Sequence, residues 1–500
     1  VSFDCHSLLV HAGASWEWAF SPAPAYISSS TDRDPVVVFG AGGSYDVTLT
    51  VTDASGASST QTVPAMVTVG PNSNCTASPV SGESLYCSGN TAHGITQDLD
   101  ITTNHLTAMA WVHPDGIQGG YTGIVLDASE SAGFNFRENN EIGYHWPGGQ
   151  WWWTSGLVAP AGQWSHVAMV LTPAGVTIYV NGEAASQNFT ASEVQLHTQL
   201  IGSYKNWGGR NMNGRIDEVK IWNRALSMGE VREQRHINLS PAEAESDPDL
   251  LSYFQFNEDI YYLVNKKPGQ GNGMFSGGAT RVLSEAPVGA GARDRFDLNG
   301  AGLYPTPNCG GSIETAAGGS TPGGEVVFNR LDLAPAGPPE DHVDGSGYWI
   351  VNTYGSAGAE AAISPIEAWN LATDASALAG FAGGAGVLTL QRRGSHSSSA
   401  GEWTPLCSGP GQVSASSGSA ATATGSCGLA ATGQFTLSGA PGCPGDMNGD
   451  LLVGVMDVLA YLSSFGCSAD CGIADINGDG LVNTTDLLLV LSLFGETCPG

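Results

Sequence analysis

The sequence predicts a mainly β protein in which β-sandwiches follow one another, with a small α-helical module at the C-terminus. Glycine is abundant, at 69 residues, and the apolar runs are short, as in chains made of many strands and turns. Apolar and polar residues alternate with the strand period in segment after segment. Residues 441–500 instead contain two longer, mostly apolar stretches, 458–465 and 487–494, each followed by glycine as a helix would be.

The charge balance argues against several kinds of partner. Seventeen basic and 47 acidic residues give a net charge of -30, which repels nucleic acid and anionic membranes. No apolar run reaches the roughly 18 residues that a membrane span requires. The sequence begins, at Val1, in what looks like a strand, with no signal peptide. We therefore expect a C-terminal fragment or processed product, with no nucleic-acid partner and no membrane span.

Residues 1–70 alternate as short strands do. The clearest strand patterns are 16–20, 36–39 and 45–53. The phrases SWEWAF, DPVVVF and GSYDVTLTVTDASG in this region resemble a PKD domain that lacks its first strand. The resemblance implies an immunoglobulin-like β-sandwich. We interpret Trp16, Trp18 and Tyr45 as packing residues rather than ligand contacts.

Residues 76–290 form the longest β region. Strand patterns lie at 107–112, 164–171 and 176–180, and the last precedes an Asn181-Gly182 hairpin turn. The succession LTAMAWV, WSHVA, YVNG and GRIDEVKIWNRALS resembles a LamG-like jelly roll of the concanavalin type. The resemblance implies a two-sheet, lectin-like fold whose partner is a glycan or a cell-surface or matrix protein.

An aromatic run, YHWPGGQWWW, ends at Trp153 within this region. If the run is a strand, Trp151 and Trp153 share one face and Trp152 lies on the other. Exposed aromatic rings stack on the apolar faces of sugars at little cost in ordering entropy. Trp146, Trp152 and Trp207 are therefore candidate glycan-binding residues. In the alternative interpretation, these rings pack between sheets and loops.

Sequence signatures of catalysis are missing. There is no HExxH zinc helix, no GxSxG elbow and no phosphate loop ending in GK[ST]. Asp217 and Glu218 belong to the strand of the LamG-like resemblance, so we assign them a role in the fold; the E-x-D-x-x-E run of related glycosidases does not occur. We interpret His145 and His166 as structural histidines. The chain is expected to be non-catalytic.

Residues 291–440 predict a third β-sandwich. Its clearest strand is 347–354. The stretch 408–433 is rich in Ser, Ala, Gly and Thr, and it predicts either a hairpin held by Cys407 and Cys427 or a loose spacer.

Residues 441–500 repeat one chemical pattern twice. Calcium takes oxygen ligands from loop positions 1, 3, 5 and 12, with a carbonyl at position 7. The ligands predicted for two Ca²⁺ ions are Asp446, Asn448, Asp450, Leu452 and Asp457 in the first loop, and Asp475, Asn477, Asp479, Leu481, Asn483 and Asp486 in the second. Three carboxylates in each loop repel one another until a cation is held between them, so calcium should couple to folding of the module.

The loop-helix repeat, with Asp at position 12 and no helix entering the loop, resembles a dockerin module. The second loop keeps Gly480 at the sharp turn where the first has Leu451, so we expect the first loop to bind calcium more weakly. The resemblance implies a cohesin-like receptor contacted through loop positions 10 and 11. Thr484-Thr485 fit that pattern and Val455-Met456 depart from it.

Ten cysteines lie mostly in local groups, which predicts disulfides and an exported protein. The candidates are Cys75 with Cys87, Cys407 with Cys427, and the group Cys443, Cys467, Cys471 and Cys498, while Cys5 and Cys309 stand apart. In that last group, Cys443 could close on Cys498 with Cys467 on Cys471, or each repeat could bridge itself.

Three functions remain. The first is a non-catalytic binding and anchoring region of a secreted or cell-surface protein, with a jelly roll for glycan binding or adhesion and a calcium module for docking. The second is the accessory tail of a secreted peptidase or polysaccharidase whose catalytic domain precedes Val1. The third is a structural stalk that calcium makes rigid. We favour the first.

Overall fold

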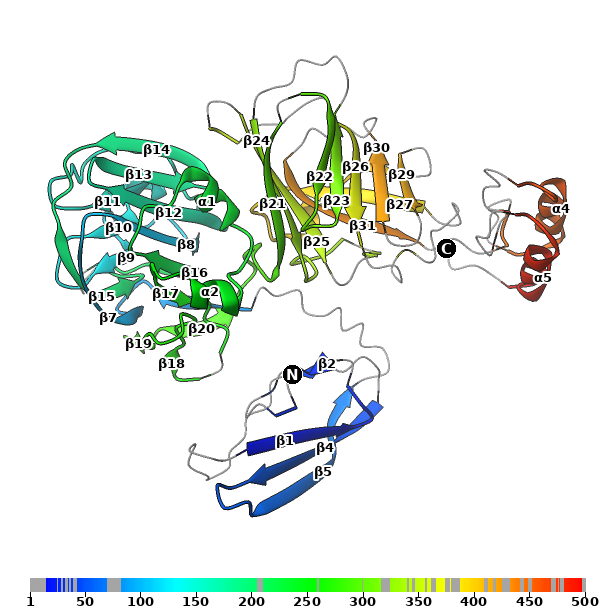
Figure 1. Ribbon diagram of the computed structural model, residues 1–500, viewed down its shortest axis with the longest axis horizontal. Helices are drawn as coiled ribbons and strands as arrows, with labels where there is room; N and C mark the ends of the chain where they lie inside the picture. Colours follow the sequence, from blue (N-terminus) through cyan, green and yellow to red (C-terminus); the bar gives the residue numbers. More distant parts are fainter. Residues whose placement is uncertain are drawn as a thin grey trace. The chain divides into compact units, whose positions relative to one another are not determined.

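The computed structural model confirms the mainly β fold class. It describes residues 15–496 except 25, 28–29, 32–34, 36, 39–42, 70–81, 205–209, 259, 299, 316–323, 340, 344–346, 356–357, 361–365, 374–377, 379–386, 409–411, 417–419, 425–431, 441–444, 448–451, 469–473, 475 and 477–480. The chain divides into two compact units, 1–77 and 78–500 (Figure 1). No helix among the described residues is long and apolar enough to cross a membrane.

The first unit contains a three-stranded antiparallel sheet. Its strands are β1 (Ser15–Ser21), β4 (Gly43–Thr52) and β5 (Ser58–Val69), in the order β1-β4-β5, and β2 (Tyr26–Ile27) pairs with β3 (Val37–Val38). Trp18 and Tyr45 are buried in its core, and Trp16 packs against them, as the packing interpretation predicted.

The second unit begins with two facing sheets that enclose one large core. One sheet has the order β11 (Ile142–His145), β10 (Gly133–Phe136), β9 (Gly123–Asp127), β15 (Val194–Ile201), β7 (His93–Thr103), β19 (Gly273–Ser276), β18 (Tyr262–Leu263). The other has the order β14 (Glu183–Asn188), β13 (Gly175–Val180), β12 (Ser165–Thr172), β8 (Leu106–Pro114), β16 (Asn213–Trp222), β6 (Glu83–Ser88), β20 (Thr280–Leu283), with β17 (Leu250–Phe254) paired to β16. The predicted hairpin turn is confirmed, because Val180 pairs with Glu183 and both Asn181 and Gly182 have positive φ.

A second sandwich follows in the same unit. Its larger sheet has the order β21 (Gly291–Leu298), β24 (Gly324–Leu331), β25 (Tyr348–Gly355), β31 (Gly433–Ala440), β27 (Val387–Arg393), β28 (Thr404–Ser408). The smaller sheet has the order β22 (Gly302–Thr306), β23 (Gly311–Thr315), β26 (Ile366–Ala372), β30 (Ala420–Thr424), β29 (Val413–Ser416). Trp349, Trp369 and Phe435 lie in its core. The Ser/Ala/Gly/Thr-rich stretch therefore supplies a hairpin, β29-β30, rather than a spacer.

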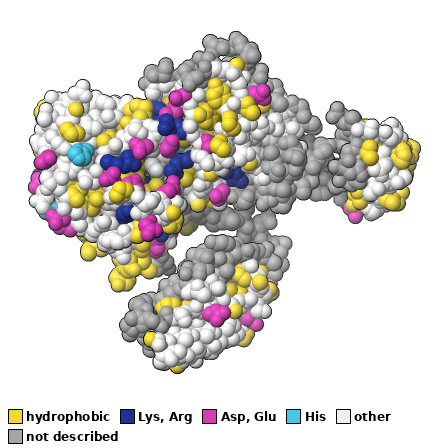
Figure 2. Space-filling model, in the orientation of Figure 1, with side chains coloured by type: hydrophobic (Ala, Val, Ile, Leu, Met, Phe, Trp, Pro, Cys, Tyr) yellow, Lys and Arg dark blue, Asp and Glu magenta, His cyan; other side chains and the backbone are white. Residues whose placement is uncertain are grey.

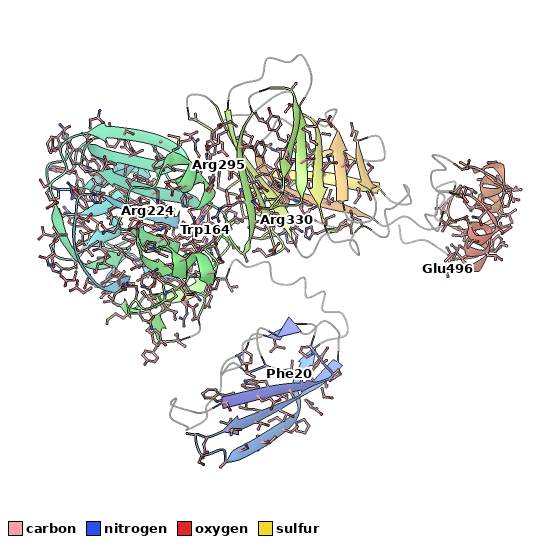
Figure 3. The ribbon with its side chains drawn as sticks, viewed as in Figure 1. Phe20, Trp164, Arg224, Arg295, Arg330 and Glu496 are labelled. Atoms are coloured by element: carbon pink, nitrogen blue, oxygen red, sulfur yellow. The ribbon has the colours of Figure 1, made fainter. Side chains whose placement is uncertain are left out.

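Two short helices, α1 (Met228–Glu233) and α2 (Pro241–Ser246), belong to the contact between the two sandwiches. Basic and acidic side chains gather beside one another in the middle of Figure 2, and Figure 3 labels Arg295 in the same region. Ion pairs that join the sandwiches include Arg232–Glu325 at 2.9 Å, Arg293–Glu243 at 3.0 Å, Arg295–Glu233 at 2.5 Å and Arg235–Glu360 at 3.8 Å. Beside them, Ile237 packs into an apolar cluster with Leu331, Tyr348 and Ile350. The jelly roll and the second sandwich are thus joined by both polar and apolar contacts.

The C-terminal segment contains α4 (Val455–Ser463) and α5 (Thr484–Ser492) around a small core of Val453, Tyr461, Ala474, Val482 and Val490. Both helices begin three residues earlier than the apolar stretches predicted. The reason is visible at α5, where Asp486 accepts a hydrogen bond from the backbone N–H of Asn483 at 3.0 Å and so caps the helix from within the predicted loop. The apolar side chains Val455, Met456, Leu459, Leu488 and Leu491 are exposed (Figure 2).

One predicted disulfide candidate is wrong. Cys87 is a free, fully buried thiol, and burial raises its pKa to about 12. Its sulfur faces Gly202 across the core so closely that a Cβ there would stand 2.6 Å away. Cys309 is likewise free and buried. Cys407 and Cys467 are disulfide-bonded, whereas Cys75, Cys427, Cys443, Cys471 and Cys498 lie outside the described residues.

Candidate ligand-binding pocket

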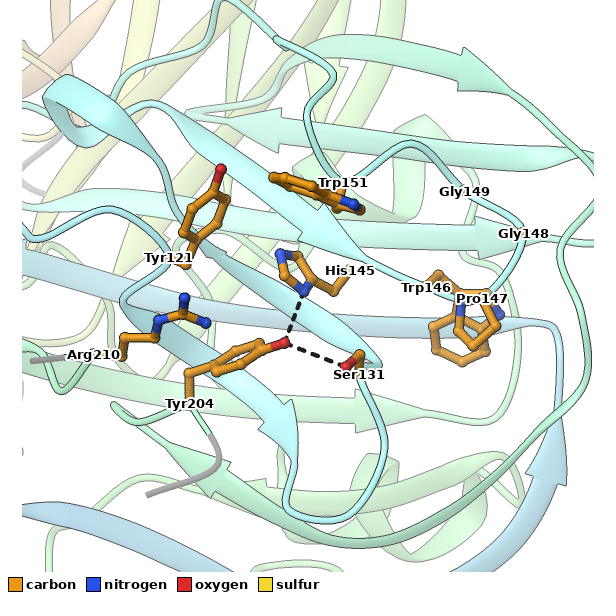
Figure 4. A pocket seen from close by; sticks show the side chains of 10 residues that line it. All are labelled: Tyr121, Ser131, His145, Trp146, Pro147, Gly148, Gly149, Trp151, Tyr204 and Arg210. Atoms are coloured by element: carbon orange, nitrogen blue, oxygen red, sulfur yellow. Dashed lines mark hydrogen bonds between the residues drawn. The ribbon is translucent and has the colours of Figure 1, made fainter. Parts of the chain in front are cut away.

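A pocket of about 450 Å³ opens at one end of the jelly roll (Figure 4). It lies where the loops around β9, β10 and β11 meet the segment that follows β15. The residues that line it are Tyr121, Ser131, His145, Trp146, Pro147, Gly148, Gly149, Trp151, Tyr204 and Arg210.

Aromatic rings form much of the wall of the pocket. The Trp151 side chain is 46% exposed. The Tyr121 ring meets it edge to face, with centroids 5.5 Å apart, and also meets His145 at 5.7 Å. Tyr204 meets His145 edge to face at 5.1 Å. Rings that support one another in this way present a rigid apolar surface to the solvent.

Polar groups lie beside the rings. The Tyr204 hydroxyl is 3.0 Å from Nδ1 of His145 and 3.3 Å from Oγ of Ser131, as the dashed lines of Figure 4 show. Arg210 places its guanidinium carbon 5.2 Å from the centre of the Tyr121 ring and 5.0 Å from that of Tyr204. The pocket therefore combines ring faces with hydroxyl, imidazole and guanidinium groups, which is the composition of a site for a small polar ligand.

The backbone around Trp151 is held by hydrogen bonds to an arginine. Nη1 of Arg137 donates to the carbonyl oxygens of Trp151 at 2.9 Å and Trp153 at 2.7 Å. Glycine is required in the preceding turn, because a Cβ on Gly149 would stand 2.6 Å from the Tyr144 hydroxyl. The loop is thus held in one shape by contacts within the jelly roll.

Comparison with protein families identifies this part of the chain. Residues 88–232 match the model of the concanavalin A-like lectin/glucanases superfamily. The match begins at the end of β6 and ends within α1, so it contains every residue that lines the pocket. The concanavalin A-like jelly roll predicted from the sequence is confirmed. No curated protein matches the chain.

Three solved structures are similar to part of this chain. A proposed carbohydrate binding protein from Bacteroides ovatus is 16% identical over 58% of this chain and 93% of its own, with a TM-score of 0.34. Domain 4 of AbnA, a GH43 extracellular arabinanase from Geobacillus stearothermophilus, is 18% identical over 30% of this chain and 86% of its own, with a TM-score of 0.24. An SAP-like pentraxin from Limulus polyphemus is 14% identical over 41% of this chain and 96% of its own, with a TM-score of 0.27. Likenesses this low do not identify a ligand.

The concanavalin A-like pocket includes one of the three tryptophans proposed from the sequence. Trp146 lines it but is only 4% exposed, and its Nε1 donates to the carbonyl of Ser192 at 2.9 Å. Trp152 is 55% exposed and lies outside the lining. Trp207 lies outside the described residues.

The expectation that the tryptophan run forms a strand is wrong, because Trp151 and Trp152 lie in a turn. In a turn the alternation of faces does not apply, and Trp151 rather than Trp152 enters the pocket. Tyr121, Tyr204 and Arg210 were missed altogether. Nothing in their local sequence separates them from other loop residues, since only the fold brings them together.

The acidic pair of the concanavalin A-like domain is buried in the fold. Asp217 accepts hydrogen bonds from Ser284 Oγ at 2.6 Å and from the backbone of Glu218 at 2.7 Å. Glu218 accepts from the Tyr253 hydroxyl at 2.6 Å and lies 3.6 Å from Lys220. Burial, and then the charge of Glu218, raise the pKa of Asp217 well above its usual value, and burial raises the pKa of Glu218. The fold role assigned from the sequence fits this network.

The two histidines differ. His166 is buried against Trp111 with ring centroids 5.6 Å apart, and burial lowers its pKa well below the usual value. His145 instead lines the pocket. The prediction of a structural histidine does not account for this place in the pocket wall.

Only some of the predicted calcium ligands are among the residues that the structure describes. Asp457 and Asp486 are fully buried at the third position of α4 and α5. The two oxygens of Asp457 accept from the backbone N–H groups of Met447 and Gly454, each at 2.7 Å. Asp446, Leu452, Leu481 and Asn483 are described, whereas Asn448, Asp450, Asp475, Asn477 and Asp479 lie outside the described residues. Among the residues that the structure describes, no group of three or more His, Cys, Asp or Glu side chains is placed to hold a metal.

Proposed function

We propose that the chain is a non-catalytic binding region of a secreted or cell-surface protein, and that its jelly roll binds a carbohydrate in the pocket around Trp151. The observation that carries the proposal is the exposed Trp151 ring, supported by Tyr121 and accompanied by polar groups, inside a domain of the lectin/glucanases superfamily. A sugar ring offers one apolar face and a rim of hydroxyls. An aromatic plane beside hydrogen-bonding groups is complementary to both.

The geometry favours binding of a sugar at limited entropic cost. Trp151 and Tyr121 each have few rotatable bonds, and each is restrained by its neighbour, so little side-chain freedom is lost when a ligand docks. The Tyr204 hydroxyl and the Ser131 hydroxyl can each donate to or accept from sugar hydroxyls. The pocket volume of about 450 Å³ suits one or two sugar rings at the end of a longer chain.

A binding role without catalysis is supported by the position of the acids. Glycoside hydrolysis commonly uses two carboxylates on either side of the bond to be cleaved. The described lining of the pocket contains neither Asp nor Glu, and the Asp217–Glu218 pair is buried under Ser284 and Tyr253. A hydrolase elsewhere in a longer parent protein is compatible with this role, and the present chain would then direct it to its substrate.

The direct test is a glycan array probed with the full chain, followed by calorimetry on the glycans that bind. We expect binding that Trp151→Ala weakens by roughly thirtyfold. Tyr261→Ala is the matched control, because Tyr261 is an aromatic residue that is 88% exposed and does not line the pocket. An array without binding, or binding that both variants reduce equally, would contradict the proposal.

A second function is proposed for the C-terminal module, which is calcium-dependent docking to another protein. The repeated spacing of Asp and Asn in the two loops supports it, together with a buried carboxylate at the third position of each helix. The exposed apolar side chains of α4 and α5 offer a surface for a partner. A cohesin-like receptor is the partner that the dockerin resemblance implies.

Calcium binding is tested by calorimetric titration of the full chain after treatment with chelator. The proposal expects two sites and a gain of helical circular dichroism signal on adding calcium. No heat of binding, with an unchanged helical signal, would leave the module as a disulfide-stabilised cap.

The disulfide-bonded state of Cys407 and Cys467 supports an extracellular location.

A further inference from the structure

The pocket around Trp151 has a charge opposite to that of the chain. The sequence has 47 acidic and 17 basic residues. Yet the described residues that line the pocket include an arginine, Arg210, and no carboxylate. Acids outnumber bases by almost three to one in the chain, so a lining with this balance favours a ligand that carries negative charge.

The guanidinium of Arg210 is held in place by aromatic rings. It lies over Tyr121 and Tyr204, at 5.2 and 5.0 Å from their centres, which is within the range of a cation-π contact. A cation-π contact involves the flat face of the guanidinium. The N–H donors of the guanidinium point outward in its plane, away from that face. Figure 4 shows Arg210 between these two tyrosines, on the side of the pocket across from Trp146 and Pro147. The guanidinium of Arg210 therefore lies in the wall of the pocket.

The backbone of Arg210 is also fixed. Its carbonyl accepts a hydrogen bond from the backbone N–H of Gly123 at 3.2 Å, and Asn211 forms a bridge with Ser203. These contacts do not involve the guanidinium, so a substitution of the side chain leaves the backbone anchors in place. Position 210 can therefore be varied to test binding without disturbing the strand ends around it.

The net charge of -30 opposes an anionic ligand only at long range. At physiological ionic strength the screening length is about 8 Å, so acidic side chains farther from the pocket than this contribute little. Arg210 lies in the wall of the pocket itself, and its interaction with a bound anion is screened much less. The charge of Arg210 therefore outweighs that of acidic side chains farther from the pocket than the screening length.

We propose that the pocket selects a sugar that carries a carboxylate, a uronic acid, with the carboxylate paired to the guanidinium of Arg210 and the sugar ring on the Trp151 side chain. This rests on the proposed function, since it assumes that the pocket binds carbohydrate. The planar fork of an arginine matches a carboxylate with two parallel hydrogen bonds, which lysine cannot reproduce. Arg210 is then the residue that determines specificity, and Trp151 supplies affinity for any sugar.

The experiment is calorimetry of the full chain with matched pairs of oligosaccharides. One member of each pair ends in glucuronate or galacturonate, and the other is the same oligosaccharide with that carboxylate reduced to a primary alcohol. We expect the acidic member to bind at least about tenfold more tightly, because a hydrogen-bonded charge pair contributes an effect of that order. Arg210→Gln should remove the difference, and Arg210→Lys should restore only part of it. Arg281→Gln should keep the difference, because it removes a cation of β20 that pairs with Glu83 of β6, outside the pocket.

The outcomes separate the two proposals. Equal affinity for the acidic and the reduced member, with Trp151→Ala still weakening binding, overturns the selection of a carboxylate and leaves carbohydrate binding intact. A preference for the acidic member that Arg210→Gln does not change also overturns the role of Arg210. Absence of binding to every member of the pairs and of the array overturns both. The comparison between paired ligands needs no variant, so it stands even if a substitution at Arg210 impairs folding.

Discussion

The guanidinium of Arg232 in α1 lies 3.7 Å from the centre of the Tyr354 ring in β25. The same guanidinium donates to Glu325 at 2.9 Å and to the carbonyl of Gly358 at 2.8 Å, and the Arg232 side chain is almost fully buried. A buried cation with an aromatic face, a carboxylate and a carbonyl around it is well compensated. One residue of the jelly roll thus ties it to the second sandwich.

A substitution at Gly182, in the hairpin turn of the jelly roll, should destabilise the protein, because Gly182 lies against Tyr354 of the second sandwich. A Cβ on Gly182, whose φ is +83°, would stand 2.1 Å from the Tyr354 hydroxyl. We expect Gly182→Ala to lower the free energy of unfolding by about 1–2 kcal/mol from the positive φ and by a further 1–3 kcal/mol from overpacking. Urea denaturation measures the loss.

The matched control is Gly269→Ala. Gly269 has a φ of +79°, but a Cβ there would meet nothing within 4 Å. Only the cost of the positive φ should appear. If the two variants lose the same free energy, the contact between Gly182 and Tyr354 does not form as described.

The tryptophan run predicts a contrast between neighbours. Trp151 lines the pocket and Trp152 does not, although Trp152 is the more exposed. We expect Trp151→Ala to weaken glycan binding by about 2 kcal/mol, roughly thirtyfold, and Trp152→Ala to weaken it much less. Calorimetry with one oligosaccharide decides between them. The reverse order would support the choice of Trp152 that the sequence suggested.

The buried acids predict a pH dependence. The pKa of Asp217 is raised well above its usual value in the folded protein, chiefly by burial. A raised carboxyl pKa means that the folded state holds its proton more tightly than the unfolded chain does, so the contribution to stability is complete below the unfolded pKa of about 3.9 and is lost as pH rises through the folded pKa. The free energy of unfolding should therefore fall as pH rises from 4 towards neutrality.

Asp217→Asn should flatten this slope, because the amide does not titrate and can keep a hydrogen bond to Ser284. Glu130→Gln, at an exposed position, is the control and should leave the slope unchanged. Urea denaturation at several pH values measures both. A slope as steep in Asp217→Asn as in the wild type would show that this carboxyl group is not the source.

The calcium proposal predicts which carboxylates matter. Asp486→Asn removes a charge from a fully buried side chain in the better-matched loop, so calcium affinity should fall at least about tenfold. Glu496→Gln removes a charge from an exposed residue of the same module and should change affinity little. Calcium titration of the full chain compares them. Equal affinities in Asp486→Asn and the wild type would exclude Asp486 as a ligand.

The elements defined by local sequence were predictable. The alternation of β8 and β12, the Asn181-Gly182 turn and the glycine that follows each C-terminal helix are properties of short segments, and the structure contains all of them. The helix starts were misplaced because Asp486 acts as a capping residue inside what looked like a loop.

The pocket was not predictable in the same way. Tyr121 precedes β9, whereas Tyr204 and Arg210 both follow β15, and they meet because β9 and β15 are neighbours in one sheet. Trp146 looked like a surface ring, but the turn directs it to the carbonyl of Ser192. Cys87 looked like half of a disulfide because Cys75 is near in sequence, yet the strand that carries it turns its side chain into the core.

The central claim is that carbohydrate binds in the pocket around Trp151. A crystal structure of the full chain with a bound oligosaccharide from the array tests it most directly. The account predicts a sugar ring lying on the Trp151 side chain, within hydrogen-bonding distance of Tyr204 or Arg210. An ordered oligosaccharide elsewhere on the jelly roll or on the second sandwich, with this pocket holding only solvent, would contradict it.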